Sequence, residues 1–194
     1  MAKLILASGS KWRKQLLEMS GFVCEAIPSD CDENIEYTNP EEYVLELSKE
    51  KAEDVAKRCK EGIVLAADTI GHMNNKRFEK PKDREEAFKF MSELSGKGND
   101  FITGVTIIDL YQNKTVSFTD NVKVKLQELS DDEINWYIDN QPNIYDCAGY
   151  VADECAALFI TELIGDYKSM VGLPINKIYN ELKKLGYSMR DFRD

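Results

Sequence analysis

The chain has 194 residues, of which 43% are hydrophobic, so it can build one sizeable core, and we expect a single domain over residues 1–194. Its formal charge of −10 opposes the binding of long nucleic acid, which depends on Lys and Arg contacts to phosphate. No segment reaches the roughly 18 consecutive apolar residues of a membrane span, which indicates a cytoplasmic protein with no membrane partner.

The N-terminal part alternates strands with a helix. Residues 3–7 form a short apolar run that predicts a buried strand, and Ser10 can cap a helix that Gly21 ends. Residues 22–27 predict a second strand. Residues 29–38 are polar and acidic, which is typical of a loop.

The next segment begins with a strong helix start. Asn39 is a typical cap, with Pro40 in the first turn, and this helix is predicted to continue to about residue 60. Residues 63–71 then form a nearly continuous apolar strand, and Asn74-Asn75 indicates a turn into another short strand.

The middle of the chain predicts a helix followed by a hairpin. Residues 83–86 resemble a capping box, and Gly96 closes the helix that they open. Residues 101–110 and 115–126 have the pattern of strands, and the polar residues 112–114 between them indicate a turn.

The C-terminal part returns to helices. Residues 130–133 form a second capping box, residues 155–163 predict a strand, and Pro174 leads into a last helix that Gly186 ends. Strands, hairpin and helices in this order indicate an α/β fold, with a mixed twisted sheet and flanking helices.

The loop after the first strand has the chemistry of a phosphate site. Ser8, Gly9 and Ser10 stand between a strand and a helix N-terminus, where free N–H groups and the helix dipole favour an anion, and Arg13 adds a cation. An ordinary helix cap at Ser10 with a turn at Gly9 explains most of this segment by itself. The terminal Gly-Lys-Ser/Thr of a Walker A loop is absent.

A second candidate is Asp68, a carboxylate at the end of an apolar strand, where burial is costly unless a cation compensates. Asp30, Asp32 and Glu33 follow the second strand, and one of them could join Asp68 in holding Mg²⁺. Lys51 and Lys80 could direct cations at a phosphate. The alternatives are a strand-end Asp satisfied by loop amides, a solvated acidic loop and solvated lysines. His72 is the only histidine, which excludes a multi-histidine metal site.

Nine short motifs in order along the chain resemble the Maf family over nearly its whole length. They are Leu6-Ala7-Ser8-Gly9-Ser10 with Arg13, Asp32-Glu33, Lys51, Ala67-Asp68-Thr69, Lys80-Pro81, Leu94-Ser95-Gly96, Thr103-Gly104-Val105, Cys147-Ala148-Gly149-Tyr150 and Val171-Gly172-Leu173-Pro174. The resemblance implies a nucleoside triphosphate pyrophosphatase with a fold like that of the inosine-triphosphate pyrophosphatases, in which two lobes surround a cleft. It also makes a homodimer plausible.

The resemblance also implies a role for each motif residue. Asp68 acts as the general base on water, which attacks the α-phosphorus and releases pyrophosphate. Mg²⁺ or another divalent cation lies near Glu33 and Asp68. Ser8, Ser10 and Arg13 hold the triphosphate. Lys51 and Lys80 stabilise the charge that develops during transfer.

Three positions give a mixed indication of the base. Trp12 resembles the family branch associated with 7-methyl-GTP and offers a flat face for stacking, although core packing beside Leu16 is the alternative. Glu154 resembles the same branch, whereas Thr69 resembles the branch that favours dTTP and UTP. Lys11 departs from the family, which usually has Pro there. We interpret the set as leaning towards a 7-methyl-GTP-like pocket, with dTTP, UTP or CTP as the other substrates.

Two further functional classes remain open at this point. A non-catalytic nucleotide-binding regulator of cell division would use the same phosphate loop, but it would not need Asp68, Glu33, Lys51 and Lys80 together. A protein with only a structural role has the acidic composition alone in its favour.

Overall fold

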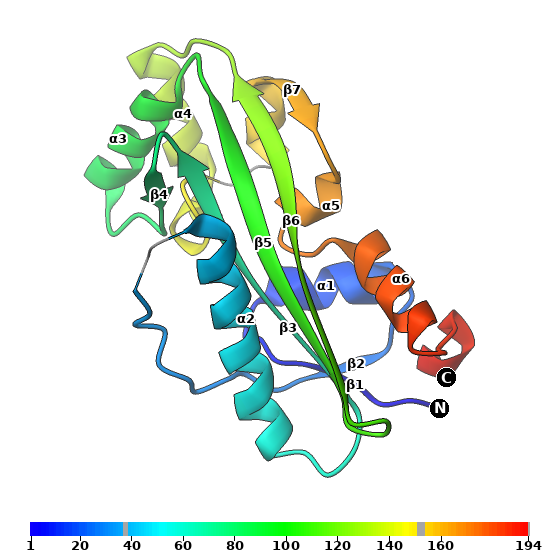
Figure 1. The fold of residues 1–194 in the computed structure, drawn as a ribbon. Coiled ribbons are helices and arrows are strands. Elements are labelled where there is room, and N and C mark those ends of the chain that lie inside the picture. The colour runs from blue at the N-terminus through cyan, green and yellow to red at the C-terminus, as the bar shows by residue number, and fades with distance from the viewer. Residues whose placement is uncertain (37–38, 151–153, 194) are drawn as a thin grey trace. The chain divides into compact units, whose positions relative to one another are not determined.

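The computed structural model describes residues 1–36, 39–150 and 154–193. Its strands form a seven-stranded sheet in the order β2-β1-β3-β5-β6-β7, and β4 pairs with β3 (Figure 1). The chain divides into two compact units. The first comprises Met1–Asp68, Thr103–Asp120 and Gly172–Asp194, and the second comprises Thr69–Ile102 and Asn121–Val171.

The first unit joins the two ends of the chain. Its elements are β1 (Leu4–Leu6), α1 (Lys11–Met19), β2 (Cys24–Ala26), α2 (Pro40–Lys57), α6 (Ile175–Lys184) and the 3-10 segment Met189–Phe192. β1 pairs in parallel with β2 and with β3. The predicted helix cap at Asn39 is confirmed, because its side chain accepts hydrogen bonds from the backbone N–H groups of Glu41 and Glu42.

Three long strands contribute to both units. They are β3 (Ile63–Met73), β5 (Gly98–Asp109) and β6 (Lys114–Leu126). β5 and β6 form the predicted hairpin, and Asn113 in its turn has a φ of 54°. The division between the units falls between Asp68 and Thr69 on β3, so these two neighbours belong to different units.

The alternation of side chains between the two faces of the sheet determines which residues of β1 and β3 face α2. Ile5 of β1 and Val64 and Ala66 of β3 pack in one cluster with Ala52 and Val55 of α2. Side chains two apart in a strand point to the same face, so Asp68 follows Val64 and Ala66 on the α2 face. The sheet pattern therefore directs this carboxylate towards α2.

The second unit has its own apolar core. Its elements are β4 (Lys76–Phe78), α3 (Arg84–Leu94), α4 (Asp131–Asn140), the 3-10 segments Pro142–Asp146 and Glu154–Leu158, β7 (Ile160–Ile164) and α5 (Tyr167–Met170). β4 is antiparallel to β3, and β7 is antiparallel to β6. Aromatic pairs such as Phe78 with Phe90 and Tyr137 with Phe159 fill the core between these elements.

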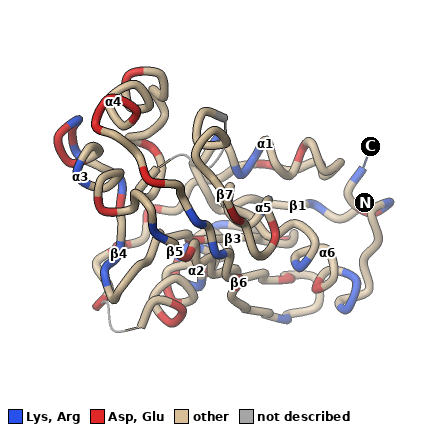
Figure 2. The backbone as a smooth tube through the Cα atoms, turned by 90° about the horizontal axis from the view of Figure 1, so that it is seen from above, with Lys and Arg blue, Asp and Glu red and all other residues tan. Residues whose placement is uncertain are grey.

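Both predicted capping sites of the second unit start helices, but only one is a full capping box. Ser130 and Glu133 exchange hydrogen bonds at the start of α4, whose first turn is acidic (Figure 2). At the start of α3, Asp83 accepts from the Glu86 N–H, but the Glu86 carboxylate accepts from the Lys82 N–H instead of closing the box. The acidic first turns still suit the helix dipole.

The predicted strand over residues 155–163 is wrong in its first half. Residues Glu154–Leu158 form a 3-10 segment, and the strand is Ile160–Ile164. An apolar run of this length fits a strand or a short helical turn equally well, so its periodicity could not decide. The second strand is also shorter than predicted, and α5 was not predicted.

Two other features concern the cysteines and the helices. All five cysteines are free and partly buried. Among the described residues, no helix combines the length and the apolar character that crossing a membrane requires.

Candidate active site

The loop between β1 and α1 folds as a capped helix start. The Ser10 hydroxyl accepts a hydrogen bond from the Arg13 N–H at 3.4 Å, and the Ser8 hydroxyl accepts from the Ser10 N–H at 3.1 Å. Ser10 is therefore the helix cap that its sequence context indicated. A hydroxyl that accepts a hydrogen bond still carries a hydrogen to donate, so both side chains keep the capacity to bind a phosphate oxygen.

Arg13 connects this loop to the segment before α6. Its Nε donates to the Gly172 carbonyl at 3.2 Å, and its Nη1 lies 3.5 Å from the Ser8 hydroxyl. Gly172 has a φ of +121°, a backbone conformation that residues other than glycine rarely adopt. A Cβ at this position would lie 3.6 Å from the Arg13 Nε. The guanidinium is thus held beside the loop between β1 and α1.

Lys51, Asp68 and Glu33 form a charged cluster in the first unit. The Lys51 Nζ lies 2.7 Å from the Asp68 Oδ1 and 3.1 Å from the Glu33 Oε1. The Lys51 and Asp68 side chains are only 10% and 14% exposed, whereas that of Glu33 is 61% exposed. The structure places Asp68 inside β3, whereas the sequence had indicated the end of the strand. Its carboxylate is compensated by Lys51 and not by loop amides alone.

Electrostatics link this cluster to Arg13. Burial lowers the pKa of Arg13, and the charges of Asp68 and Glu33 partly oppose that effect. For Lys51, burial also lowers the pKa, but the charge and hydrogen bond of Asp68 and the charge of Glu33 outweigh it, so the pKa of Lys51 is raised. Two cations and two carboxylates therefore act on one another, although the predicted roles came from separate motifs.

The position of Lys51 depends on a close approach between the backbones of α2 and β5. A Cβ at Gly104 of β5 would stand 2.2 Å from the Val44 carbonyl oxygen, so the backbone of α2 rests directly on this glycine. One turn before Lys51, the buried Ser48 hydroxyl lies 2.8 Å from that of Thr106 on β5. In the sequence, Gly104 was notable only as part of a motif, and neither Ser48 nor Thr106 was identified. A glycine flanked by Thr and Val inside a strand was the available signal.

Four other predicted residues lie in different parts of the structure. Trp12 is half-buried in the first turn of α1, next to the capped loop. Lys80 is exposed after β4, and Thr69 is half-buried on β3; both belong to the second unit. Glu154 begins a 3-10 segment, and its side chain lies outside the described part of the chain. The first unit by itself brings together Ser8, Ser10 and Arg13, and separately Glu33, Lys51 and Asp68.

The donor set of this unit suits Mg²⁺ in kind. Glu33 and Asp68 offer hard carboxylate oxygens, both already close to the cation of Lys51. Within residues 1–36, 39–150 and 154–193, no group of three or more His, Cys, Asp and Glu side chains is arranged to hold a metal. Mg²⁺ usually binds to proteins through one or two carboxylates and completes its shell with water and substrate phosphates, which these two residues fit.

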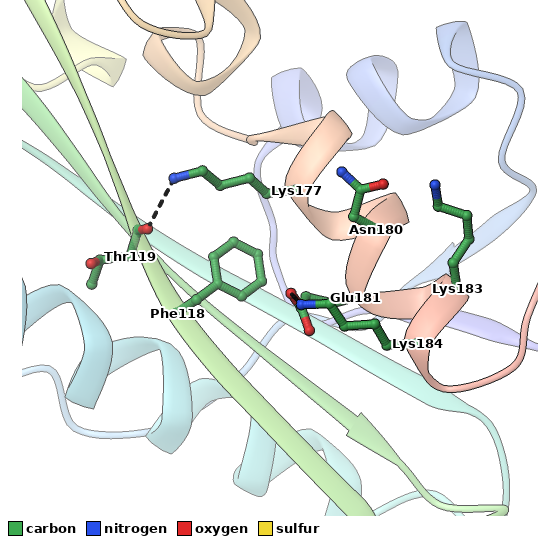
Figure 3. A pocket seen from close by; sticks show the side chains of 7 residues that line it. All are labelled: Phe118, Thr119, Lys177, Asn180, Glu181, Lys183 and Lys184. Atoms are coloured by element: carbon green, nitrogen blue, oxygen red, sulfur yellow. Dashed lines mark hydrogen bonds and ion pairs between the residues drawn. The ribbon is translucent and has the colours of Figure 1, made fainter.

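A separate groove of the first unit contains none of the predicted site residues. It runs between β6 and α6 and is lined by Phe118, Thr119, Lys177, Asn180, Glu181, Lys183 and Lys184 (Figure 3). The Lys184 Nζ lies 2.6 Å from Glu181, and Lys177 is paired with Asp120. Its lysines are therefore largely neutralised by neighbours, which weakens the groove as an anion site.

Comparison with known proteins agrees with the motif set. The model of the Maf-like protein family matches residues 3–185. The chain belongs to the Maf-like protein family. The resemblance based on the nine motifs is thereby confirmed.

Several relatives of this Maf-like protein carry the name dTTP/UTP pyrophosphatase. The relative from Carboxydothermus hydrogenoformans is 39% identical over 185 residues, covering 95% of this chain and 100% of the relative. The relative from Thermoanaerobacter sp. is 41% identical, covering 94% and 96%. The Staphylococcus aureus Ham1 protein structure matches 64% of this chain and 71% of its own, with a TM-score of 0.47 and 15% identity.

Proposed function

We propose that this Maf-like protein hydrolyses a nucleoside triphosphate to the monophosphate and pyrophosphate. The carrying observation is the Lys51 ammonium bound between Asp68 and Glu33, in the same compact unit as the Ser8, Ser10 and Arg13 loop. A binding protein needs cations for the phosphates, but it does not need a mostly buried carboxylate inside an otherwise apolar strand. A general base does need such a carboxylate.

In the proposed reaction, Arg13 and the Ser8 and Ser10 hydroxyls bind triphosphate oxygens. Asp68 accepts a proton from a water molecule whose oxygen forms a bond to the α-phosphorus. The bond between the α-phosphorus and the bridging oxygen breaks, and pyrophosphate leaves with that electron pair. Lys51 stabilises the negative charge of the phosphate oxygens during this displacement, and Lys80 contributes a second cation.

A divalent cation is part of the proposal. Glu33 and Asp68 would hold it together with phosphate oxygens, and it would neutralise phosphate charge and orient the leaving group. With a metal bound there, Lys51 would still have a carboxylate and phosphate oxygens as partners. This requirement predicts that EDTA removes activity and that added Mg²⁺ restores it.

For the substrate, we propose dTTP and UTP. The relatives named dTTP/UTP pyrophosphatase span nearly the whole chain. Thr69 also resembles the family branch that favours dTTP and UTP. Trp12 and Glu154 indicate a 7-methyl-GTP-like pocket instead. The relatives' names outweigh two positions, so we rank 7-methyl-GTP and CTP after dTTP and UTP.

The test is product analysis over dTTP, UTP, CTP, 7-methyl-GTP and the purine triphosphates with Mg²⁺. We expect monophosphate and pyrophosphate in equal amounts, with dTTP and UTP turned over fastest. Asp68→Asn should lower kcat by about a thousandfold or more, since the base loses its proton affinity. Asp139→Asn, which alters a surface ion pair with Arg84, is the matched control. Formation of diphosphate and single phosphate, or tight binding without turnover, would contradict the proposal.

A further inference from the structure

The loop after β2 runs along one face of α2 and contacts it at three successive points (Figure 1). The Arg58 Nη2 donates to the Pro28 carbonyl at 2.7 Å. The Asp54 Oδ2 accepts from the Asp30 N–H at 3.0 Å. The Glu33 carboxylate meets Lys51 at 3.1 Å.

The helix residues of these contacts share a face. Lys51, Asp54 and Arg58 are spaced by three and then four residues, which places them one above the other along the helix. Arg58 also donates to the Asp54 Oδ2 at 2.7 Å, so one guanidinium nitrogen joins the Pro28 carbonyl to the Asp54 carboxylate. The hydrogen bond from Asp30, together with Arg58, lowers the pKa of Asp54 and keeps it charged as the acceptor.

The first two contacts fix where the third can form. Only two residues separate Asp30, held on Asp54, from Glu33, whose side chain is 61% exposed and pairs with Lys51. At the N-terminal end of this stretch, Pro28 lies near Gly9 of the predicted phosphate loop, since a Cβ added at Gly9 would stand 3.8 Å from the Pro28 side chain. The stretch from Pro28 to Glu33 is thus held at one end beside Gly9 and at the other beside Lys51.

We propose that Arg58, acting through Asp54, is a positioning residue that holds the loop of residues 28–33 on α2 and so keeps Glu33 beside Lys51 and Asp68. Arg58 touches neither substrate nor metal in this account. The inference rests on the proposed function in one respect: Glu33 must contribute to the binding of the metal and nucleotide. The clamp itself, meaning the Pro28, Asp30, Asp54 and Arg58 contacts, rests on geometry alone.

The first measurement follows the loop without using activity. Cys31 lies inside the held stretch and is half-buried, with its thiol 3.8 Å from the Ser29 hydroxyl. We expect Arg58→Ala to speed alkylation of Cys31 by iodoacetamide about three- to tenfold, the scale of losing two exposed charge-assisted contacts. Mass spectrometry locates the label, and Cys147 and Cys155 of the second unit serve as internal references.

The second measurement is kinetic. Releasing Glu33 should raise the KM for the Mg²⁺–nucleotide complex several-fold in Arg58→Ala and leave kcat at saturation within about twofold, because Asp68 and Lys51 stay paired. Arg58→Lys should show a smaller rise in KM than Arg58→Ala, because its ammonium can make some of the contacts of Arg58. It should not reach the wild-type KM, because an ammonium cannot reproduce the planar guanidinium fork. Lys57→Ala, on the exposed adjacent position, removes the same charge without touching the loop and should resemble the wild type.

The outcomes separate the proposals. Cys31 labelling in Arg58→Ala equal to that in Lys57→Ala would show that the clamp does not hold the loop. Faster labelling with unchanged KM would show that the clamp exists but does not place Glu33, which also overturns the inference. A wild-type protein that hydrolyses no triphosphate would instead overturn the proposed function, and the clamp would then be judged on labelling alone.

Discussion

Replacing Gly104 with alanine tests how α2 is seated on the sheet. The added Cβ would lie 2.2 Å from the Val44 carbonyl oxygen and 2.4 Å from the Val44 carbonyl carbon. Both are backbone atoms of a helix, so no side chain can rotate away. Ordinary contact begins at 3.4 Å, and the helix must therefore move by about 1.2 Å, the difference between 3.4 Å and 2.2 Å.

This movement has two expected consequences. Overpacking of a well-packed core costs about 1–3 kcal/mol, which for a chain of this length corresponds to a loss of about 2–12 °C in Tm. If the whole shift reaches Lys51, its 2.7 Å contact with Asp68 lengthens to about 3.9 Å. A misplacement of about 1 Å in a catalytic group can cost about a hundredfold in rate, so we expect kcat to fall by about 10- to 100-fold.

The measurements are a thermal melt followed by circular dichroism and the rate of pyrophosphate release from dTTP at saturation. Gly98→Ala is the matched control, because Gly98 lies on the same strand and its Cβ would meet only the Val124 carbonyl at an ordinary 3.5 Å. Equal Tm and kcat in the two variants would refute the seating argument. A lower Tm with unchanged kcat would show that α2 is displaced without moving Lys51.

Three further predictions concern single groups. Lys51→Met should lower kcat by at least about a hundredfold by removing the cation that faces Asp68, while Lys49→Met on the exposed side of the same helix should have little effect in the same assay. Burial raises the pKa of Tyr150 above its ordinary 10.0, so the folded state holds the phenol proton more tightly than the unfolded state does. The unfolding free energy should therefore fall as the pH rises above about 10. Urea titrations should show a smaller fall in Tyr150→Phe than in the wild type. Ser130→Ala should lower the unfolding free energy by about 1 kcal/mol in the same titrations, because the capping box of α4 is lost.

The sequence predicted the elements with strong local chemistry. Asn39, Asp83 and Ser130 start helices where expected, because a side-chain cap acts within three residues and needs no tertiary partner. The β5–β6 hairpin was likewise predicted from its two strand patterns and the turn between them. Residues 155–158 were predicted wrongly as a strand, because their apolar side chains have no period that favours a strand over a 3-10 turn.

For the site, the sequence supplied residue types but not partners. The carboxylate of Asp68 in an apolar run indicated a need for either a compensating cation or loop amides, and the structure shows the cation of Lys51. Glu33 and Lys51 were equally compatible with solvated surface positions. Which lysine meets Asp68 depends on the register of α2 on β3 and β5. No local pattern contains that register, since it is set where Gly104 meets the helix backbone.

The same face of α2 explains why these separate motifs form one system. Ser48 lies against Thr106, Lys51 against Asp68, and Arg58 against the loop that carries Glu33. A helix moves as a rigid body over a few turns, so a shift at one of these contacts reaches the others. In the proposed reaction, this acidic protein can present a cation to a triphosphate because α2 contacts both the sheet and the loop, and Lys51 lies between those two contacts.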